Sequence, residues 1–294
     1  MREVTPNLDP KDFWSSELKK FIPKFLEKHP TLRNFREKAS VILHGSITLG
    51  IDDLFADIDL WFLIPDEEFV ELKNTSESLF FDIEVNDKLG HLNAEPIKEF
   101  SRHVYQLKDG YDQSDMDIIF QLRNAEIIID NTGIGGELIN TVSQPMRKEV
   151  RELFFFYHYV EMRGEHRACD NPMERNDPVA FLLSLPKVLA HALRAAMVLD
   201  GEPYPYDKWL YYTASKTPTG KKLVPSIDRI IDLIANDTLR FNGTEAENPI
   251  SQELRVIRKT LIEEAQAKGN RSTWLDKWWL YMTQPRDKLK NIRW

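Results

Sequence analysis

The sequence predicts an α+β fold, with a mixed sheet and flanking helices in the first half of the chain and helices alone in the second. Two observations support this prediction. Strand-like apolar runs bounded by turn residues recur before about residue 145 and then stop. Beyond that point apolar residues recur every three or four positions, which is typical of amphipathic helices. We therefore expect two domains, 1–145 and 146–294.

The first half is expected to begin with a helix and to continue with strands. Aromatic and aliphatic residues recur at helical spacing over 11–28, despite Pro23. Strand-like runs then lie at 41–44, in an acid-bearing segment that ends at Ile64, and at 79–85, 118–122 and 125–130.

The second half is expected to be helical throughout. Helical patterns cover 147–167, 178–201, 226–240, 251–268 and 273–290, and a polar, proline-bearing loop is expected between the first two. Asp177 has the character of an N-cap, and Pro178 suits the first position of the helix that follows it.

Composition narrows the class of protein. The chain has 42% hydrophobic and 29% charged residues, which is typical of a globular protein with a core. Its formal net charge of −8 argues against a duplex nucleic-acid partner. The single cysteine, Cys169, excludes an intramolecular disulfide. With no signal-peptide pattern and no apolar run near the roughly 18 residues that span a bilayer, we expect a cytoplasmic protein without a membrane partner.

Two acids interrupt an otherwise apolar strand. At a period of two, one face carries the apolar side chains Ile58, Leu60, Phe62 and Ile64. The other face carries Asp57 and Asp59, whose carboxylates point the same way and repel unless a cation or water relieves them. The upstream Gly45 and Ser46 form a turn at which backbone N–H groups and a hydroxyl are able to approach phosphates. Mg²⁺ suits this chemistry because it takes oxygen ligands from carboxylates and substrate phosphates.

The combination resembles the DNA polymerase β-like nucleotidyltransferase superfamily. The matching residues are Val41-Ile42-Leu43-His44-Gly45-Ser46, a gap of ten residues, and Asp57-Ile58-Asp59-Leu60. The resemblance implies that Gly45 and Ser46 bind the nucleotide and that Asp57 and Asp59 bind two Mg²⁺ ions. It also implies a third metal-binding carboxylate on the next strand, beside the first two.

The antibiotic-modifying members, of the kanamycin (aminoglycoside) type, resemble the chain most in layout. They carry Glu-Val-Asn where this chain has Glu84-Val85-Asn86, which favours Glu84 as the third metal ligand, with Asp82 as the alternative. Their catalytic base lies in a Glu-aromatic-small-Gly stretch, whose nearest counterpart here is Glu161-Met162-Arg163-Gly164, so Glu161 is the preferred candidate, with Glu152 and Glu165 on the same helix. Their phosphate-contacting lysine, four residues further on, is replaced here by Glu165, and this departure puts aminoglycoside specificity in question. Lys208, between Tyr206 and Trp209, is a candidate phosphate contact or else a lysine that covers an aromatic cluster.

The resemblance implies an enzyme that transfers a nucleoside monophosphate, most simply AMP from ATP, to a hydroxyl of a small molecule. Glu161 would take the acceptor proton, in an acceptor cleft between the domains. Two alternatives stay open: a nucleotidyltransferase acting on RNA or protein, and a non-catalytic nucleotide-binding regulator of the same fold. Whether the protein works as a homodimer also stays open.

Overall fold

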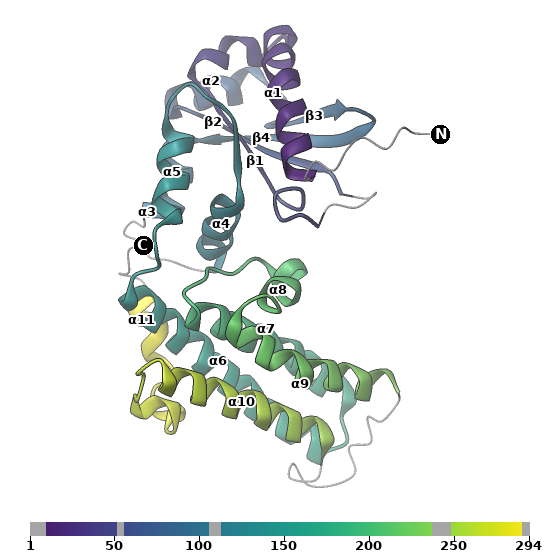
Figure 1. Cartoon of the computed structure of the whole chain (residues 1–294), viewed down its shortest axis with the longest axis vertical. Coiled ribbons are helices and arrows are strands. Elements are labelled where there is room, and N and C mark those ends of the chain that lie inside the picture. The colour runs from purple at the N-terminus through teal and green to yellow at the C-terminus, as the bar shows by residue number, and fades with distance from the viewer. Residues whose placement is uncertain (1–9, 52–55, 106–112, 237–247, 290–294) are drawn as a thin grey trace. The chain divides into compact units, whose positions relative to one another are not determined.

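The computed structural model describes residues 10–51, 56–105, 113–236 and 248–289 (Figure 1). The chain forms two compact units. Unit 1 contains the described residues of 1–106 and 118–144, and unit 2 contains those of 107–117 and 145–294. Unit 1 holds a sheet with helices, and unit 2 is helical, so the predicted α+β class is confirmed.

The sheet of unit 1 has five strands in the order β3-β4-β2-β1-β5. They are β1 (Ser40–His44), β2 (Ile58–Ile64), β3 (Phe80–Val85), β4 (Lys88–Pro96) and β5 (Glu126–Asp130). The β2–β4 pair is parallel, and the other pairs are antiparallel. The sheet is therefore mixed, as the sequence predicts.

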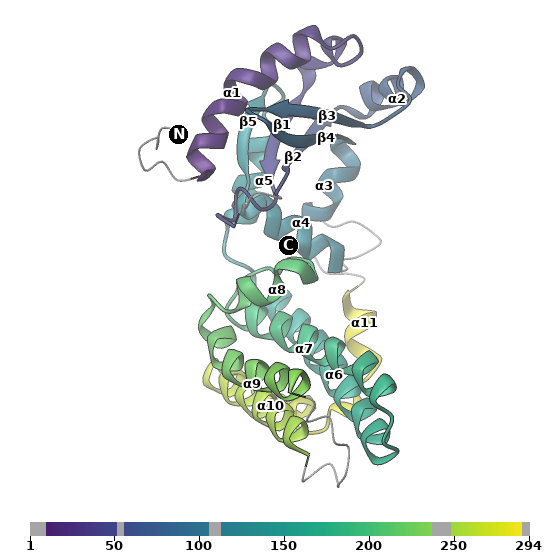
Figure 2. The same ribbon diagram turned by 90° about the vertical axis from the view of Figure 1, so that its right-hand side faces the viewer.

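One face of the sheet builds the core of unit 1. The even-numbered side chains of β2, from Ile58 to Ile64, are buried there, as their alternation predicts. Helix α1 (Pro10–Lys28) covers this face with Leu18, Ile22 and Leu26, and α2 (Asp66–Thr75) adds Leu72 (Figures 1 and 2). The side chains of Asp59 and Trp61 lie on the opposite face of β2.

Two expectations for unit 1 are wrong. Residues 118–122 are not a strand, because they lie in α4 (Gln113–Asn124), where burial of Met116, Ile119 and Phe120 follows helical spacing. Strand β4 was not expected, because its segment contains Gly90, Asn93 and few β-branched residues. Pairing on both sides, with β2 and β3, supplies the stability that its composition does not. Helices α3 (Ile97–Tyr105) and α5 (Ile134–Ser143) complete the unit.

Unit 2 consists of helices. They are α6 (Lys148–Glu174), α7 (Pro178–Leu199), α8 (Asp207–Ala214), α9 (Pro218–Ala235), α10 (Pro249–Ala267) and α11 (Gln284–Leu289). The Asp177 side chain accepts a hydrogen bond from Ala180 N at 3.0 Å, so the expected N-cap of α7 is confirmed. By length and composition α7 is able to cross a membrane, but 56% of its apolar window is buried inside the protein, and core packing accounts for its composition.

Two expectations for unit 2 are corrected. The expected loop after 167 is helical to Glu174, because Cys169 and Met173 extend the buried stripe of α6 by one more turn. Burial also raises the pKa of the Cys169 thiol to about 12, so the thiol is unreactive. The described part of 273–290, up to residue 289, is not one helix. It forms two 3₁₀ turns, Thr273–Leu275 and Trp278–Leu280, before α11.

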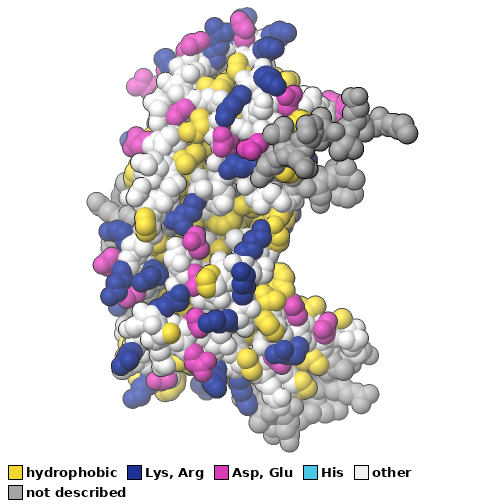
Figure 3. Space-filling view, viewed as in Figure 1, with side chains coloured by type: hydrophobic (Ala, Val, Ile, Leu, Met, Phe, Trp, Pro, Cys, Tyr) yellow, Lys and Arg dark blue, Asp and Glu magenta, His cyan; other side chains and the backbone are white. Residues whose placement is uncertain are grey.

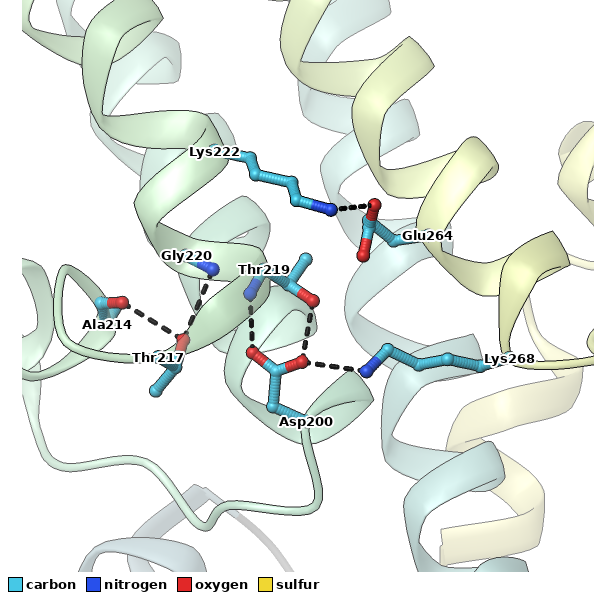
Figure 4. A network of polar contacts seen from close by, with 8 residues as sticks. All are labelled: Asp200, Ala214, Thr217, Thr219, Gly220, Lys222, Glu264 and Lys268. Carbon is cyan, nitrogen blue, oxygen red and sulfur yellow. Dashed lines mark hydrogen bonds and ion pairs between the residues drawn. The ribbon is translucent and has the colours of Figure 1, made fainter.

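Asp200 connects three helices of unit 2 (Figure 4). It caps the end of α7 and accepts hydrogen bonds of 2.7 Å from both the N–H and the hydroxyl of Thr219, in the first turn of α9. Lys268, at the end of α10, donates to the same carboxylate at 2.9 Å. The Asp200 side chain is only 3% exposed, so this carboxylate needs all of these partners.

We expect Asp200→Ala to lower the free energy of unfolding by about 3 kcal/mol, because it leaves the two buried donors of Thr219 without an acceptor and removes the partner of the exposed Lys268. Urea unfolding followed by far-ultraviolet circular dichroism measures the change. Glu263→Ala is the control, since its ion pair with Lys259 is exposed and is expected to contribute less than about 0.5 kcal/mol. Equal effects of the two substitutions would contradict the role given to Asp200.

Unit 2 also contains a pair of neutral histidines, of which His158 is buried and His191 is partly buried. His158 Nδ1 lies 2.9 Å from His191 Nδ1, and His158 Nε2 lies 2.7 Å from the Tyr204 hydroxyl. Burial lowers the pKa of His191 to about 4 and that of His158 well below its ordinary value. Both imidazoles are therefore uncharged in the folded protein at neutral pH.

These shifts predict acid sensitivity. Below the ordinary histidine pKa of about 6.5, His158 and His191 bind protons in the unfolded chain but not in the folded protein. Stability is therefore complete above pH 6.5 and is lost as pH falls toward about 4, the folded pKa of His191. Urea midpoints at pH 7.5, 6.5 and 5.5 should decrease in that order, and less steeply for His191→Gln. Identical slopes for the variant and the wild type would contradict this assignment.

Candidate active site

The turn after β1 lies directly against an acid of β2. His44, the last residue of β1, pairs with Asp59, and Gly45 follows with a φ of +80°. A Cβ placed on Gly45 would lie 2.4 Å from Asp59 Oδ2, so any other residue at this position has to displace the Asp59 carboxylate. The turn is closed by Thr48, whose hydroxyl donates to the Gly45 carbonyl at 2.9 Å. The structure thus brings the expected nucleotide-binding turn and one expected metal ligand together.

Ser46 presents donors at this turn. Its carbonyl accepts the N–H groups of Leu49 and Ile51, each at 3.2 Å. Within the described part of the chain, the N–H and hydroxyl of Ser46 donate no hydrogen bond. These two donors are the groups that the resemblance assigns to phosphate binding.

His44 is a site residue that the sequence reasoning did not use. Its ring stacks on Trp61, with centroids 3.7 Å apart, and its Nδ1 lies 2.7 Å from the Gln121 side-chain oxygen. Burial lowers its pKa to about 4, although Gln121 and the charge of Asp57 act in the opposite direction. A neutral, firmly held ring therefore supports the strand end next to Asp59. The position of His44 directly before Gly45 is the sequence feature from which its place at the site could have been predicted.

Asp57 immediately precedes β2, and its nearest described partner is a histidine. Strand β4 lies beside β2 and places His91 opposite Asp59. His91 Nε2 is 3.7 Å from Asp57 Oδ2, and His91 Nδ1 is 3.0 Å from Asp82 Oδ1 on β3. Register thus aligns Asp59, His91 and Asp82 in one row across neighbouring strands. Neither His91 nor β4 was predicted.

The expectation that Glu84 lies on the strand beside Asp57 and Asp59 is wrong. Glu84 is exposed on the edge strand β3, and β4 separates β3 from β2. Two strand spacings amount to about 10 Å, too far for one ion to bind both Glu84 and Asp59. Asn86 and Asp87, with φ of 52° and 63°, form the tight turn of the β3–β4 hairpin, so the Glu-Val-Asn stretch has a structural reason here. That turn was the sequence signal for β4.

If Asp57 and Asp59 bind a magnesium ion, they do not need a third side-chain ligand. Among the described residues, no group of three or more His, Cys, Asp or Glu side chains is arranged to hold a metal. Mg²⁺ is usually bound by one or two carboxylates, with substrate phosphates and water completing its shell. The Asp57 side chain is 51% exposed, which leaves it accessible to such a partner.

Glu161 and Lys208 belong to unit 2. Glu161, on α6, accepts hydrogen bonds from Arg286 Nε at 2.7 Å and Arg286 Nη2 at 2.6 Å. Each carboxylate oxygen therefore accepts one hydrogen bond from Arg286. Lys208, on α8, places its Nζ 4.6 Å from the centre of the Trp209 ring, which matches the aromatic-covering alternative. The roles of Glu161 as base and of Lys208 as phosphate contact stay predictions, as does the cleft between the domains.

No protein-family model matches the sequence, and no curated protein matches it. Among solved structures, the chain is similar to the crystal structure of a nucleotidyltransferase-like protein from Exiguobacterium sibiricum 255-15. The TM-score is 0.45 at 11% sequence identity, and the match covers 93% of this chain and 80% of that chain. An activity does not follow from likeness at this level, so the residues of the site have to support it.

Proposed function

We propose that the protein is a Mg²⁺-dependent nucleotidyltransferase that moves a nucleoside monophosphate, most simply AMP from ATP, to a hydroxyl of a small molecule. One observation carries the proposal: the Gly45 backbone lies against the Asp59 carboxylate, at the strand end that also carries Asp57. A turn whose Ser46 donors bind no described residue, beside two carboxylates, suits the binding of a metal–triphosphate complex.

Each residue of this site has a part in the proposal. Asp57 and Asp59 would hold Mg²⁺, two ions in the full resemblance, which supplies positive charge to the transferred phosphoryl group. Gly45 leaves space beside Asp59 because it has no side chain. The N–H and hydroxyl of Ser46 would donate to phosphate oxygens. Positioning and neutralisation of charge are the main demands of this reaction.

Unit 2 would supply the remaining groups. Glu161 is the proposed base for the acceptor hydroxyl, which would share this carboxylate with Arg286 or displace it. Lys208 is the proposed contact to the triphosphate, and it has to leave the Trp209 ring to serve there. Both roles rest on the resemblance.

One observation favours a second candidate, a nucleotide-binding regulator without turnover. The strand beside β2 carries His91, not an acid, opposite Asp59. The superfamily resemblance implies a third carboxylate at the neighbouring strand, and its replacement would weaken metal binding more than nucleotide binding. The two candidates differ in one measurable property, the release of pyrophosphate.

Pyrophosphate release from each of the four nucleoside triphosphates, with Mg²⁺, tests the choice. The acceptor panel holds hydroxyl-bearing metabolites and aminoglycosides, with RNA and a protein mixture as separate arms. The proposal expects release with a small-molecule acceptor that Asp59→Asn abolishes. Tight ATP binding without release in any arm would favour the regulator. Neither binding nor release would refute both candidates.

A further inference from the structure

Unit 2 contains an apolar pocket between three helices. Its volume is about 570 Å³, within the range of pockets that hold small organic ligands. Its apolar lining comes from α7, α8 and α9: Leu189, Leu193, Leu210, Ile227 and Ile231. Ile231 is 52% exposed, so part of this lining faces water.

The polar lining of the pocket is acidic. Asp207, Asp228 and Asp232 line it, and no lysine or arginine does. Asp207 has a partner outside the lining, because Arg194 Nη2 lies 2.5 Å from its Oδ1. In Figure 3, hydrophobic, acidic and basic side chains lie next to one another where α8 and α9 run in Figure 1. The pocket therefore combines an apolar lining with three carboxylates, of which Asp207 is paired with Arg194.

Two of these carboxylates are exposed on the same helix. Asp228 and Asp232 are four residues apart on α9, so they share one face of the helix and repel. Asp228 accepts a hydrogen bond of 2.5 Å from the Tyr211 hydroxyl, which fixes the ring at the pocket wall. The Asp232 side chain forms no ion pair or hydrogen bond with any described residue. A cation between the two acids would relieve the repulsion.

We propose that this pocket binds an organic ammonium compound with an apolar body. The ammonium group would lie between Asp228 and Asp232, with the Tyr211 ring as an additional cation–π partner. The apolar body would lie against Leu189, Leu193 and the other aliphatic side chains of the pocket. The negative charge of the two carboxylates would favour a cation over a neutral compound or an anion. The apolar lining would favour a compound with an apolar body. This inference does not depend on the nucleotide site, which lies in unit 1.

Three probes with the same apolar body test the proposal: 4-phenylbutylammonium, 4-phenylbutanol and 4-phenylbutyrate. Isothermal titration calorimetry with the full chain at low ionic strength measures each affinity. The ammonium is expected to bind about fivefold or more tightly than the alcohol, which corresponds to one ion pair near the surface, and the carboxylate is expected to bind most weakly. Equal affinities, or no binding of the ammonium, would overturn the proposal.

Substitutions in the lining of the pocket test whether the probes bind there. The double change Asp228→Asn and Asp232→Asn should reduce the preference for ammonium over alcohol to about onefold without lowering the melting temperature. Ile231→Ser should weaken both probes while keeping the preference. Asp276→Asn, an exposed acid of unit 2 outside the pocket, is the control and should change neither. A preference that survives the double change, or a dimer by sedimentation that Ile231→Ser dissociates, would overturn the assignment to a small cation.

Discussion

Asp59→Asn is expected to lower kcat by about 10³-fold or more, and Asp57→Asn to do the same, because each removes a carboxylate that would hold the metal. Asparagine keeps the shape of the side chain, so the fold should be retained. The melting temperature of the metal-free protein should stay constant or rise, since two like charges no longer face each other. Steady-state kinetics at saturating ATP and thermal unfolding measure both effects.

The control for these variants follows from the order of the strands. Glu84 lies on the edge strand β3, with β4 between it and β2, so Glu84→Gln should change kcat little. Asp82→Asn removes the partner of His91 and should cost about 10–100-fold, as is typical for a group that orients another residue. If Glu84→Gln is as damaging as Asp59→Asn, or if the Asp59 variant unfolds, the site is assigned incorrectly.

Gly45→Ala is expected to lower kcat by about 10²–10³-fold, because the new Cβ would lie 2.4 Å from Asp59 Oδ2 and has to displace that carboxylate. The left-handed φ of +80° adds a stability cost of about 1–2 kcal/mol. Kinetics and urea unfolding of the same preparation separate the two contributions.

Gly133→Ala is the matched control for that substitution. Gly133 has a φ of +76° and no atom within 4 Å of the position of its Cβ, so its replacement brings the backbone strain without the collision. It should lose a similar amount of stability and keep its activity. If both alanine variants lose activity equally, strain in unit 1 explains the effect, and the contact between Gly45 and Asp59 does not.

Much of unit 1 could be predicted from the sequence because its pattern is local. Alternation along β2 identifies both the buried face and the face of Asp59, and the turn at Gly45 follows directly from the strand before it. Register across the sheet is not local. It depends on β4, whose glycine and polar residues give no strand signal, and on the Asn86-Asp87 turn that pairs β4 with β3. Because this hairpin was not predicted, the strand of Glu84 was expected next to β2, whereas β4 lies between them.

The same distinction explains the errors in helices. The apolar run 118–122 is too short for its periodicity to distinguish a strand from a helix. Tertiary packing of its side chains favours the helix α4. Pro172 and the polar residues around it indicated a loop, but burial of Cys169 and Met173 keeps the end of α6 helical. The engagement of Glu161 by Arg286 joins residues 125 positions apart, and no local pattern reports it.

Calorimetric binding of a non-hydrolysable ATP analogue, with and without Mg²⁺, tests the central claim most directly. The claim is that Gly45, Ser46, Asp57 and Asp59 form one metal–nucleotide site. The predicted result is binding that requires Mg²⁺, that is lost in the double variant Asp57→Asn and Asp59→Asn, and that persists in Glu84→Gln. Binding that is independent of Mg²⁺, or equal in the wild type and the double variant, would contradict the claim, as would no binding at all.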